Sequence, residues 1–271
     1  MQSGKLYIYT IPKAGTYFLA KLASKMGWKD TGIHVAGDHV LDTHRVDLKT
    51  AAEYPTRTRA KQWLPVTLKS IKKGELCFGH ISPIFFLPRF QAAFTILACK
   101  RRLKDALVAE FVDLRFRRKD APDLSRVKFS DDRAAFVHYL ETKAAGMRGI
   151  AGAFLAHVAV RQLDYFAGTR KLGDYLEISF EDLFGAAPLP TVRKIAEAFG
   201  LNWSDDKLLS IYTEACQEDN KTKSTAEELP LDREALWTPE AEELYRSMGF
   251  PRLEGLLGYA EESKPVVRDR T

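Results

Sequence analysis

The sequence predicts an α/β protein in which a central parallel sheet lies between helices. Short apolar runs alternate with longer stretches of helical periodicity, which is the pattern of parallel strands joined by helical crossovers. The run at 94–99 is almost wholly apolar, as is typical of a central strand buried on both faces. With 271 residues, of which 45% are hydrophobic, the chain is long enough for a substantial core. We therefore expect a single domain over residues 1–271.

The expected elements follow in order along the chain. The expected strands cover 5–10, 75–78, 94–99 and 174–180, and the expected helices cover 16–27, 103–116, 133–167 with a break near Gly149 and Gly152, 189–199 and 204–216. A last helix should begin at Pro239, because Thr238 is a good N-cap residue and proline is favoured at the first helical position. The segment 28–70 contains glycines and prolines, so we expect loops and short helices there that line an acceptor pocket.

The first strand runs into the first helix through the turn Pro12-Lys13-Ala14-Gly15-Thr16. The backbone N–H groups of such a turn and the dipole of the helix favour an anion, and Lys13 adds a full positive charge. The order differs from the Walker A loop, in which the lysine follows the second glycine. The turn predicts an anion site, although an ordinary strand-to-helix turn with a surface lysine has the same sequence features.

Polar residues also follow two further strands. His80 comes after the strand at 75–78, and Lys100-Arg101-Arg102 ends the apolar strand. Ligands bind beyond the carboxyl ends of the strands in an open parallel sheet, so we expect these groups to converge with Lys13 if the strands are neighbours. A structural histidine and solvated surface cations are the alternatives; position at strand ends favours ligand contacts for His80 and Arg101.

Taken in order, these segments resemble the sulfotransferases that use 3′-phosphoadenosine 5′-phosphosulfate (PAPS). The resemblance runs from about residue 5 to 260 and rests on segments 12–16 (PKAGT), 79–83 (GHISP), 101–105 (RRLKD), 180–183 (FEDL), 237–240 (WTPE) and 257–259 (LGY). It implies a three-layer fold of the P-loop-kinase type, with a central parallel sheet flanked by helices.

The resemblance also implies PAPS as cofactor, PAP as product, and a role for each matching residue. Lys13 would stabilise charge on the leaving phosphate, and His80 would act as base toward a hydroxyl or amine of the acceptor. The implied cofactor-binding residues are Lys13, Ala14, Gly15, Thr16, Tyr17, Arg101, Phe180, Thr222, Lys223 and Ser224. The last three lie within 217–236, a polar segment that would cover the cofactor. A metal is not required, because lysine and backbone dipoles supply the positive field.

The chain departs from this family where the 3′-phosphate and the adenine would bind. Ala109 stands in place of a serine that binds the 3′-phosphate, and Phe180 in place of a tyrosine that meets the adenine. The segment 221–224 replaces an Arg-Lys-Gly sequence. These changes leave the 5′ end of the implied cofactor site intact and alter its 3′ end.

The candidate acceptor-binding residues are His34, Asp38, Asp42 and Phe85. His34, His39 and His44 recur every five residues, which does not align them on one helix face, so we do not expect a metal site. The expected acceptor is a small molecule, such as a secondary metabolite. Its identity, and the choice between oxygen and nitrogen, stay open.

The composition of the chain argues against several other classes of protein. The net charge of +5 suits an anionic ligand but is too small and dispersed to indicate nucleic acid. No apolar run approaches the ~18 residues of a membrane span, and the N-terminus lacks a secretory signal pattern. The three cysteines show no CxxC spacing and fit a reducing compartment. We expect a cytoplasmic monomer or homodimer without membrane or nucleic-acid partners.

Two other function classes stay open at this point. One is a nucleotide phosphotransferase with a P-loop-like site. The other is a non-catalytic PAP-binding or scaffold protein on the same fold.

Overall fold

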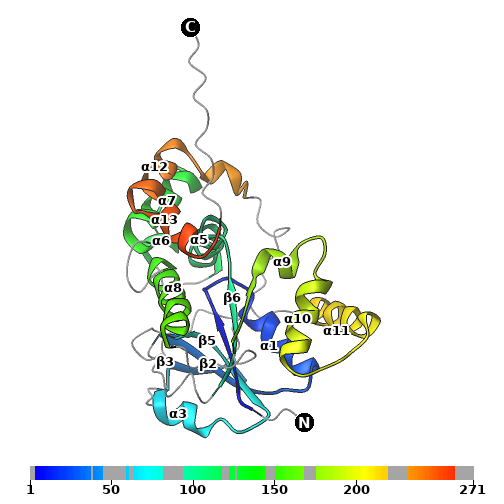
Figure 1. The fold of residues 1–271 in the computed structure, drawn as a ribbon. Coiled ribbons are helices and arrows are strands. Elements are labelled where there is room, and N and C mark those ends of the chain that lie inside the picture. The colour runs from blue at the N-terminus through cyan, green and yellow to red at the C-terminus, as the bar shows by residue number, and fades with distance from the viewer. Residues whose placement is uncertain are drawn as a thin grey trace.

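A computed structural model describes residues 4–37, 39–44, 59–60, 64–81, 94–117, 122–125, 127–144, 150–167, 175–218 and 231–259. Seven strands form one sheet in the order β4-β3-β2-β5-β1-β6-β7 (Figure 1). The strands are β1 (Leu6–Thr10), β2 (Lys29–Gly37), β3 (His39–Asp42), β4 (Arg59–Ala60), β5 (Glu75–Ile81), β6 (Thr95–Lys100) and β7 (Tyr175–Ser179). Pairing is parallel from β2 to β7 and antiparallel between β2, β3 and β4.

Helices lie around this sheet. The helices are α1 (Thr16–Lys25), α3 (Leu64–Ser70), α5 (Leu103–Val112), α6 (Pro122–Ser125), α7 (Asp132–Tyr139), α8 (Ile150–Ala167), α9 (Phe180–Phe184), α10 (Leu189–Ala198), α11 (Asp205–Gln217), α12 (Pro239–Ser247) and α13 (Phe250–Leu256). Short π-helical turns, η3 (Asp113–Arg117) and η4 (Leu140–Ala144), extend α5 and α7, and a 3-10 turn, η5 (Glu234–Leu236), precedes α12. In Figure 1, α1, α10 and α11 gather beside one part of the sheet, and α5, α7, α12 and α13 gather at another.

Side chains of the central strands alternate between two apolar clusters. Leu6 and Ile8 of β1 join the cluster that contains α1, whereas Tyr7 and Tyr9 join the cluster that contains Leu68 of α3. Successive strand residues point to opposite faces, so both faces of the sheet are covered. This double burial explains why β1 and β6 read as continuous apolar runs rather than as alternating ones.

The expectation of loops and short helices over 28–70 is wrong for most of the described residues there. They form β2, β3 and β4, and only α3 is helical. Gly32, which suggested a loop, lies inside β2 with a φ of 69°. The pairing of β2 with β5 shifts register between Asp30 and His34, so the glycine marks a bulge within a strand.

The other expected elements agree with the structure to within a few residues. Helix α12 begins at Pro239, and the Thr238 hydroxyl accepts a hydrogen bond from Ala241 N–H (3.2 Å). The helix expected over 103–116 is α-helical to Val112 and then becomes the π-helical η3. The short helix α6 (Pro122–Ser125) has no counterpart among the expected elements. Among the helices described, none is long and apolar enough to span a bilayer.

Candidate functional site

The turn between β1 and α1 is built on two residues in the left-handed region of backbone conformation. Gly15, the N-cap of α1, has a φ of 79°, and a Cβ there would lie 3.1 Å from the Phe184 ring. Lys13 has a φ of 67°, which is uncommon for a residue with a side chain. Such conformations cost free energy and concentrate at ligand sites. The turn therefore presents the N-terminus of α1 in a close-packed, constrained geometry.

His80 lies beside this turn, because β5 pairs directly with β1. Its Nδ1 is 2.7 Å from the carbonyl oxygen of Thr10. A carbonyl only accepts, so Nδ1 donates and the Nε2 of the neutral ring is left as an unprotonated acceptor. Thr10 also links His80 to α1, since the Thr10 hydroxyl lies 2.6 Å from that of Thr16.

Burial lowers the pKa of the half-buried His80 imidazole to about 4; the hydrogen bond to Thr10 opposes this shift and the charge of Lys13 adds to it. The imidazole is therefore neutral at pH 7 in this structure. A neutral ring with a fixed tautomer and an unprotonated Nε2 has the protonation state that a general base needs.

The ammonium of Lys13 forms an ion pair with Asp113, the first residue of η3. The Lys13 side chain is 22% exposed and that of Asp113 is 5% exposed. Sequence reasoning missed Asp113. The available signal was an isolated acidic residue between apolar neighbours, Val112 and Leu114, near the end of a buried helix.

Arg101 joins the turn from the end of β6. Its Nη1 donates to the carbonyl oxygen of Lys13 (2.5 Å), and its guanidinium carbon lies 4.1 Å from the centre of the Phe180 ring. Phe180 in turn approaches Gly15, with a ring carbon 3.6 Å from the position of a Cβ there. The buried Nε of Arg101 has no hydrogen-bond partner among the described residues. Burial lowers the pKa of this guanidinium, with the nearby Asp105 acting against the shift. The predicted residues Lys13, Gly15, Arg101 and Phe180 are thus brought together.

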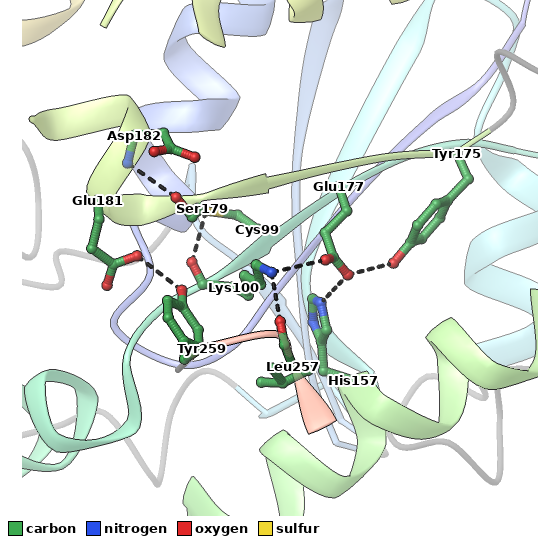
Figure 2. A network of polar contacts seen from close by, with 10 residues as sticks. All are labelled: Cys99, Lys100, His157, Tyr175, Glu177, Ser179, Glu181, Asp182, Leu257 and Tyr259. Carbon is green, nitrogen blue, oxygen red and sulfur yellow. Dashed lines mark hydrogen bonds and ion pairs between the residues drawn. The ribbon is translucent and has the colours of Figure 1, made fainter. Parts of the chain in front are cut away.

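The chain's own carboxylates occupy the first backbone N–H groups near α5. Arg102 N–H donates to Glu181 (2.8 Å) and Leu103 N–H to Glu254 (2.5 Å). The Tyr259 hydroxyl also donates to Glu181 (2.8 Å), as Figure 2 shows. Burial, followed by the charge of Glu181, raises the pKa of this phenol. The segments 180–183 and 257–259 therefore meet, and the N-terminus of α5 is already capped by carboxylates.

His34 and Tyr17 lie next to His80, on the side of β2. The His34 ring is edge-on to that of His80, with ring centres 5.4 Å apart, and its Nδ1 is 3.0 Å from the Tyr17 hydroxyl. Burial lowers the pKa of His34 to about 3, and the proximity of His80 adds to the effect. The buried His34 Nε2 has no hydrogen-bond partner in the described part of the chain. The structure thus places Tyr17, expected to bind cofactor, together with the acceptor candidate His34.

Other candidates lie elsewhere or outside the described residues. Asp42, at the end of β3, accepts a hydrogen bond from His44 N–H (3.1 Å), which is a turn contact. Ala14 and Thr16 belong to the turn itself, and both are buried. The candidates that lie outside the described residues are Asp38, Phe85, Thr222, Lys223 and Ser224. Within the described ranges, no three histidine, cysteine or acidic side chains are grouped as a metal site would require.

Lys100, which we expected at the ligand edge with Arg101, has a structural role instead. Its ammonium donates to the carbonyl of Leu257 (2.6 Å) and lies 3.3 Å from Glu177 of β7 (Figure 2). The same carboxylate contacts His157 Nε2 (3.1 Å) and the Tyr175 hydroxyl (3.2 Å). This network ties β6, β7 and α8 to the residues after α13. Arg102 is exposed, as a surface cation would be.

Comparison with known proteins identifies the fold. No protein-family model matches the sequence, and no curated protein matches it significantly. Among solved structures, mouse sulfotransferase SULT7A1 complexed with PAP is similar with a TM-score of 0.60 and 16% identity, over 96% of this chain and 90% of that chain. Retinol dehydratase in complex with androsterone and inactive cofactor PAP is similar with a TM-score of 0.60 and 10% identity, over 98% of this chain and 84% of that chain.

The chain therefore has the fold of the sulfotransferases, which is of the P-loop-kinase type. The predicted fold class is confirmed, with the addition of antiparallel strands β3 and β4 at one edge of the parallel sheet. At these identities the likeness shows the fold alone.

Proposed function

We propose that this chain is a PAPS-dependent sulfotransferase that transfers a sulfuryl group to a hydroxyl or amine of a small-molecule acceptor, such as a secondary metabolite. The observation that carries the proposal is the meeting of Lys13, His80 and Arg101 at the carboxyl ends of adjacent parallel strands, β1, β5 and β6. Sulfuryl transfer, like phosphoryl transfer, depends mainly on positioning and on stabilising negative charge. An anion-binding turn beside a neutral histidine meets both needs.

The described residues fit the 5′ end of such a nucleotide. The constrained turn and the N-terminus of α1 suit a phosphate. The Nε of Arg101, which has no hydrogen-bond partner among the described residues, would serve the 3′-phosphate. We propose that Lys13 to Tyr17, Arg101 and Phe180 hold the cofactor, and that residues 222–224 cover it. PAPS supplies the activated sulfuryl group in this chemistry.

His80 would take the proton of the acceptor through Nε2. The Thr10 carbonyl fixes the tautomer and stabilises the imidazolium that forms. A pKa of about 4 makes His80 a weak base in this structure, and the Lys13 charge contributes to that low value. An anion bound at Lys13 would offset this charge and raise the pKa of His80 toward the range useful for catalysis. Cofactor binding would therefore activate the base.

Binding and activity test the proposal in two steps. PAP, ADP and ATP are compared by thermal shift and calorimetry, and transfer of labelled sulfuryl from PAPS is then measured with a panel of phenol and amine acceptors. We expect PAP to bind best, Lys13→Ala and His80→Ala to lose most of the transfer, and the control variants Lys194→Ala and His138→Ala to keep it. Full transfer in both site variants would refute the proposal. Stronger stabilisation by ATP would favour a nucleotide phosphotransferase.

One observation favours a second candidate, a non-catalytic PAP-binding protein. Glu181 and Glu254 occupy the N-terminus of α5, and Ala109 offers no side-chain donor where the 3′-phosphate is expected. PAP binding without turnover on any acceptor would support this second function.

A further inference from the structure

The ion pair between Lys13 and Asp113 joins the anion-binding turn to the end of α5. Asp113 begins η3, where the helix changes from α-helical to π-helical hydrogen bonding, and such turns are frequent at functional sites. Its carboxylate is almost completely buried, so it is poorly hydrated and its attraction for the Lys13 ammonium is screened little by water.

The backbone of Lys13 is held while its side chain stays partly exposed. The residue keeps a φ of 67°, and its carbonyl accepts from Arg101. The side chain, in contrast, is 22% exposed. An anion seated at the N-terminus of α1 would attract the same ammonium. One cation would thus be shared between a buried carboxylate and an anionic ligand.

We propose that Asp113 is a positioning residue that competes with the bound nucleotide for the ammonium of Lys13. This inference rests on the proposed function. Competition loosens the hold of the site on the nucleotide and so favours release of PAP after transfer. Release limits turnover in many enzymes, so a device that weakens product binding raises kcat at the expense of affinity.

A purely structural role of the ion pair, or direct repulsion of the ligand by Asp113, would give different results. If the pair only stabilises the fold, neutralising Asp113 lowers the melting temperature and leaves nucleotide affinity unchanged. If Asp113 repels the ligand directly, neutralising it tightens binding whether or not Lys13 is present. Competition for Lys13 predicts tighter binding only when Lys13 is present, which a double-mutant cycle measures.

The experiment is calorimetric titration of the full chain with PAP and, separately, with inorganic pyrophosphate. The proteins are the parent, Asp113→Asn, Lys13→Met, the double variant, and Asp123→Asn as a control. Asp123 pairs with Lys143, and these two side chains are 36% and 41% exposed. We expect Asp113→Asn to tighten both ligands about tenfold, equivalent to ~1.4 kcal/mol. It should lower both the KM for PAPS and kcat, and the double variant should bind as Lys13→Met does.

Each outcome decides the matter. Unchanged affinity in Asp113→Asn, or tightening that persists without Lys13, overturns the inference while leaving the proposed function intact. If the parent binds pyrophosphate but not PAP, the proposed function fails, and the pyrophosphate cycle still supports or overturns the competition. Binding of neither ligand by any variant overturns both. Asp113→Ser replaces Asp113→Asn if the latter does not fold, with the same expected tightening.

Discussion

Acidification should destabilise this protein through His34. The side chain is buried at 5% exposure, and burial lowers the pKa of its imidazole to about 3. In the unfolded chain the same imidazole titrates near 6.5. The unfolded state therefore binds the proton first as the pH falls, so the stability that the neutral ring provides is complete above about pH 6.5 and is lost progressively toward pH 3.

The magnitude follows from the interval between these pKa values. Between about pH 6.5 and 5 the unfolded imidazole becomes protonated while the folded one does not. At about 1.36 kcal/mol per pH unit over roughly 1.5 units, His34 should contribute ~2 kcal/mol of lost unfolding free energy. Other titrating groups add their own dependence, so the contribution of His34 is obtained as a difference between variants.

Urea denaturation at pH 8 and pH 5 measures this difference. His34→Asn keeps a polar group near the Tyr17 hydroxyl, which lies 3.0 Å from Nδ1 in the parent. We expect the fall in unfolding free energy between the two pH values to be smaller by ~2 kcal/mol in His34→Asn than in the parent. His138→Asn, on α7, is the matched control. An unchanged pH dependence in His34→Asn would refute the assignment of a buried, neutral His34.

Three further predictions concern the turn, the base and the buried network. Gly15→Ala should lower the free energy of unfolding by about 1–2 kcal/mol, because alanine disfavours the left-handed backbone conformation there. It should also weaken PAP binding, because the added Cβ would lie 3.1 Å from the Phe184 ring and shift the turn. Gly27→Ala is the control: its φ is 98°, and an added Cβ would meet no atom within 4 Å. It should show the backbone cost alone when the thermal unfolding of both variants is measured. His80→Gln should lower kcat by about 10²–10⁴ while PAP affinity in calorimetry changes less than threefold; a matching loss of affinity would argue for a binding role. Lys100→Met should cost about 3 kcal/mol in urea denaturation, because Glu177 loses its ammonium partner, and retention of full stability would contradict the structural role given to Lys100.

Local sequence patterns predicted the elements whose signals are local. The signal for an element can lie within its own few residues, and each such element formed as expected. Examples are the Pro-Lys-Ala-Gly-Thr turn, the helix start at Thr238 and Pro239, and the apolar run at 94–99. The strands in 28–70 depend on distant pairing. Strand β2 is stabilised by β5, about 45 residues away, and the bulge at Gly32 made its sequence look like a loop.

The sequence predicted which site residues follow strands, and they meet only because those strands are neighbours in the sheet. Lys13, His80 and Arg101 follow three strands, and adjacency of those strands brings them together. Lys100 and Arg101 are neighbours in sequence, but alternation along β6 puts Ala98 on the face of Tyr9, and Lys100 follows on that face. Lys100 therefore contacts Glu177 rather than the turn.

The partners of two other site residues could not be predicted from the sequence, even where the residue itself stood out. Asp113 reaches Lys13 from the far end of a helix, and Glu254 caps α5 from a helix about 150 residues later in the chain. Neither spacing is periodic, so only the folded structure places them.

Calorimetric titration with PAP asks whether this chain binds the proposed cofactor, and it requires no knowledge of the acceptor. We expect PAP to bind to the parent chain, ADP to bind more weakly, and Lys13→Met to reduce PAP affinity at least about tenfold, or ~1.4 kcal/mol. Lys194→Met, on the exposed surface of α10, should bind PAP as the parent does. Absence of PAP binding to the parent, or equal affinity in Lys13→Met, would show that the turn between β1 and α1 is not a PAPS site.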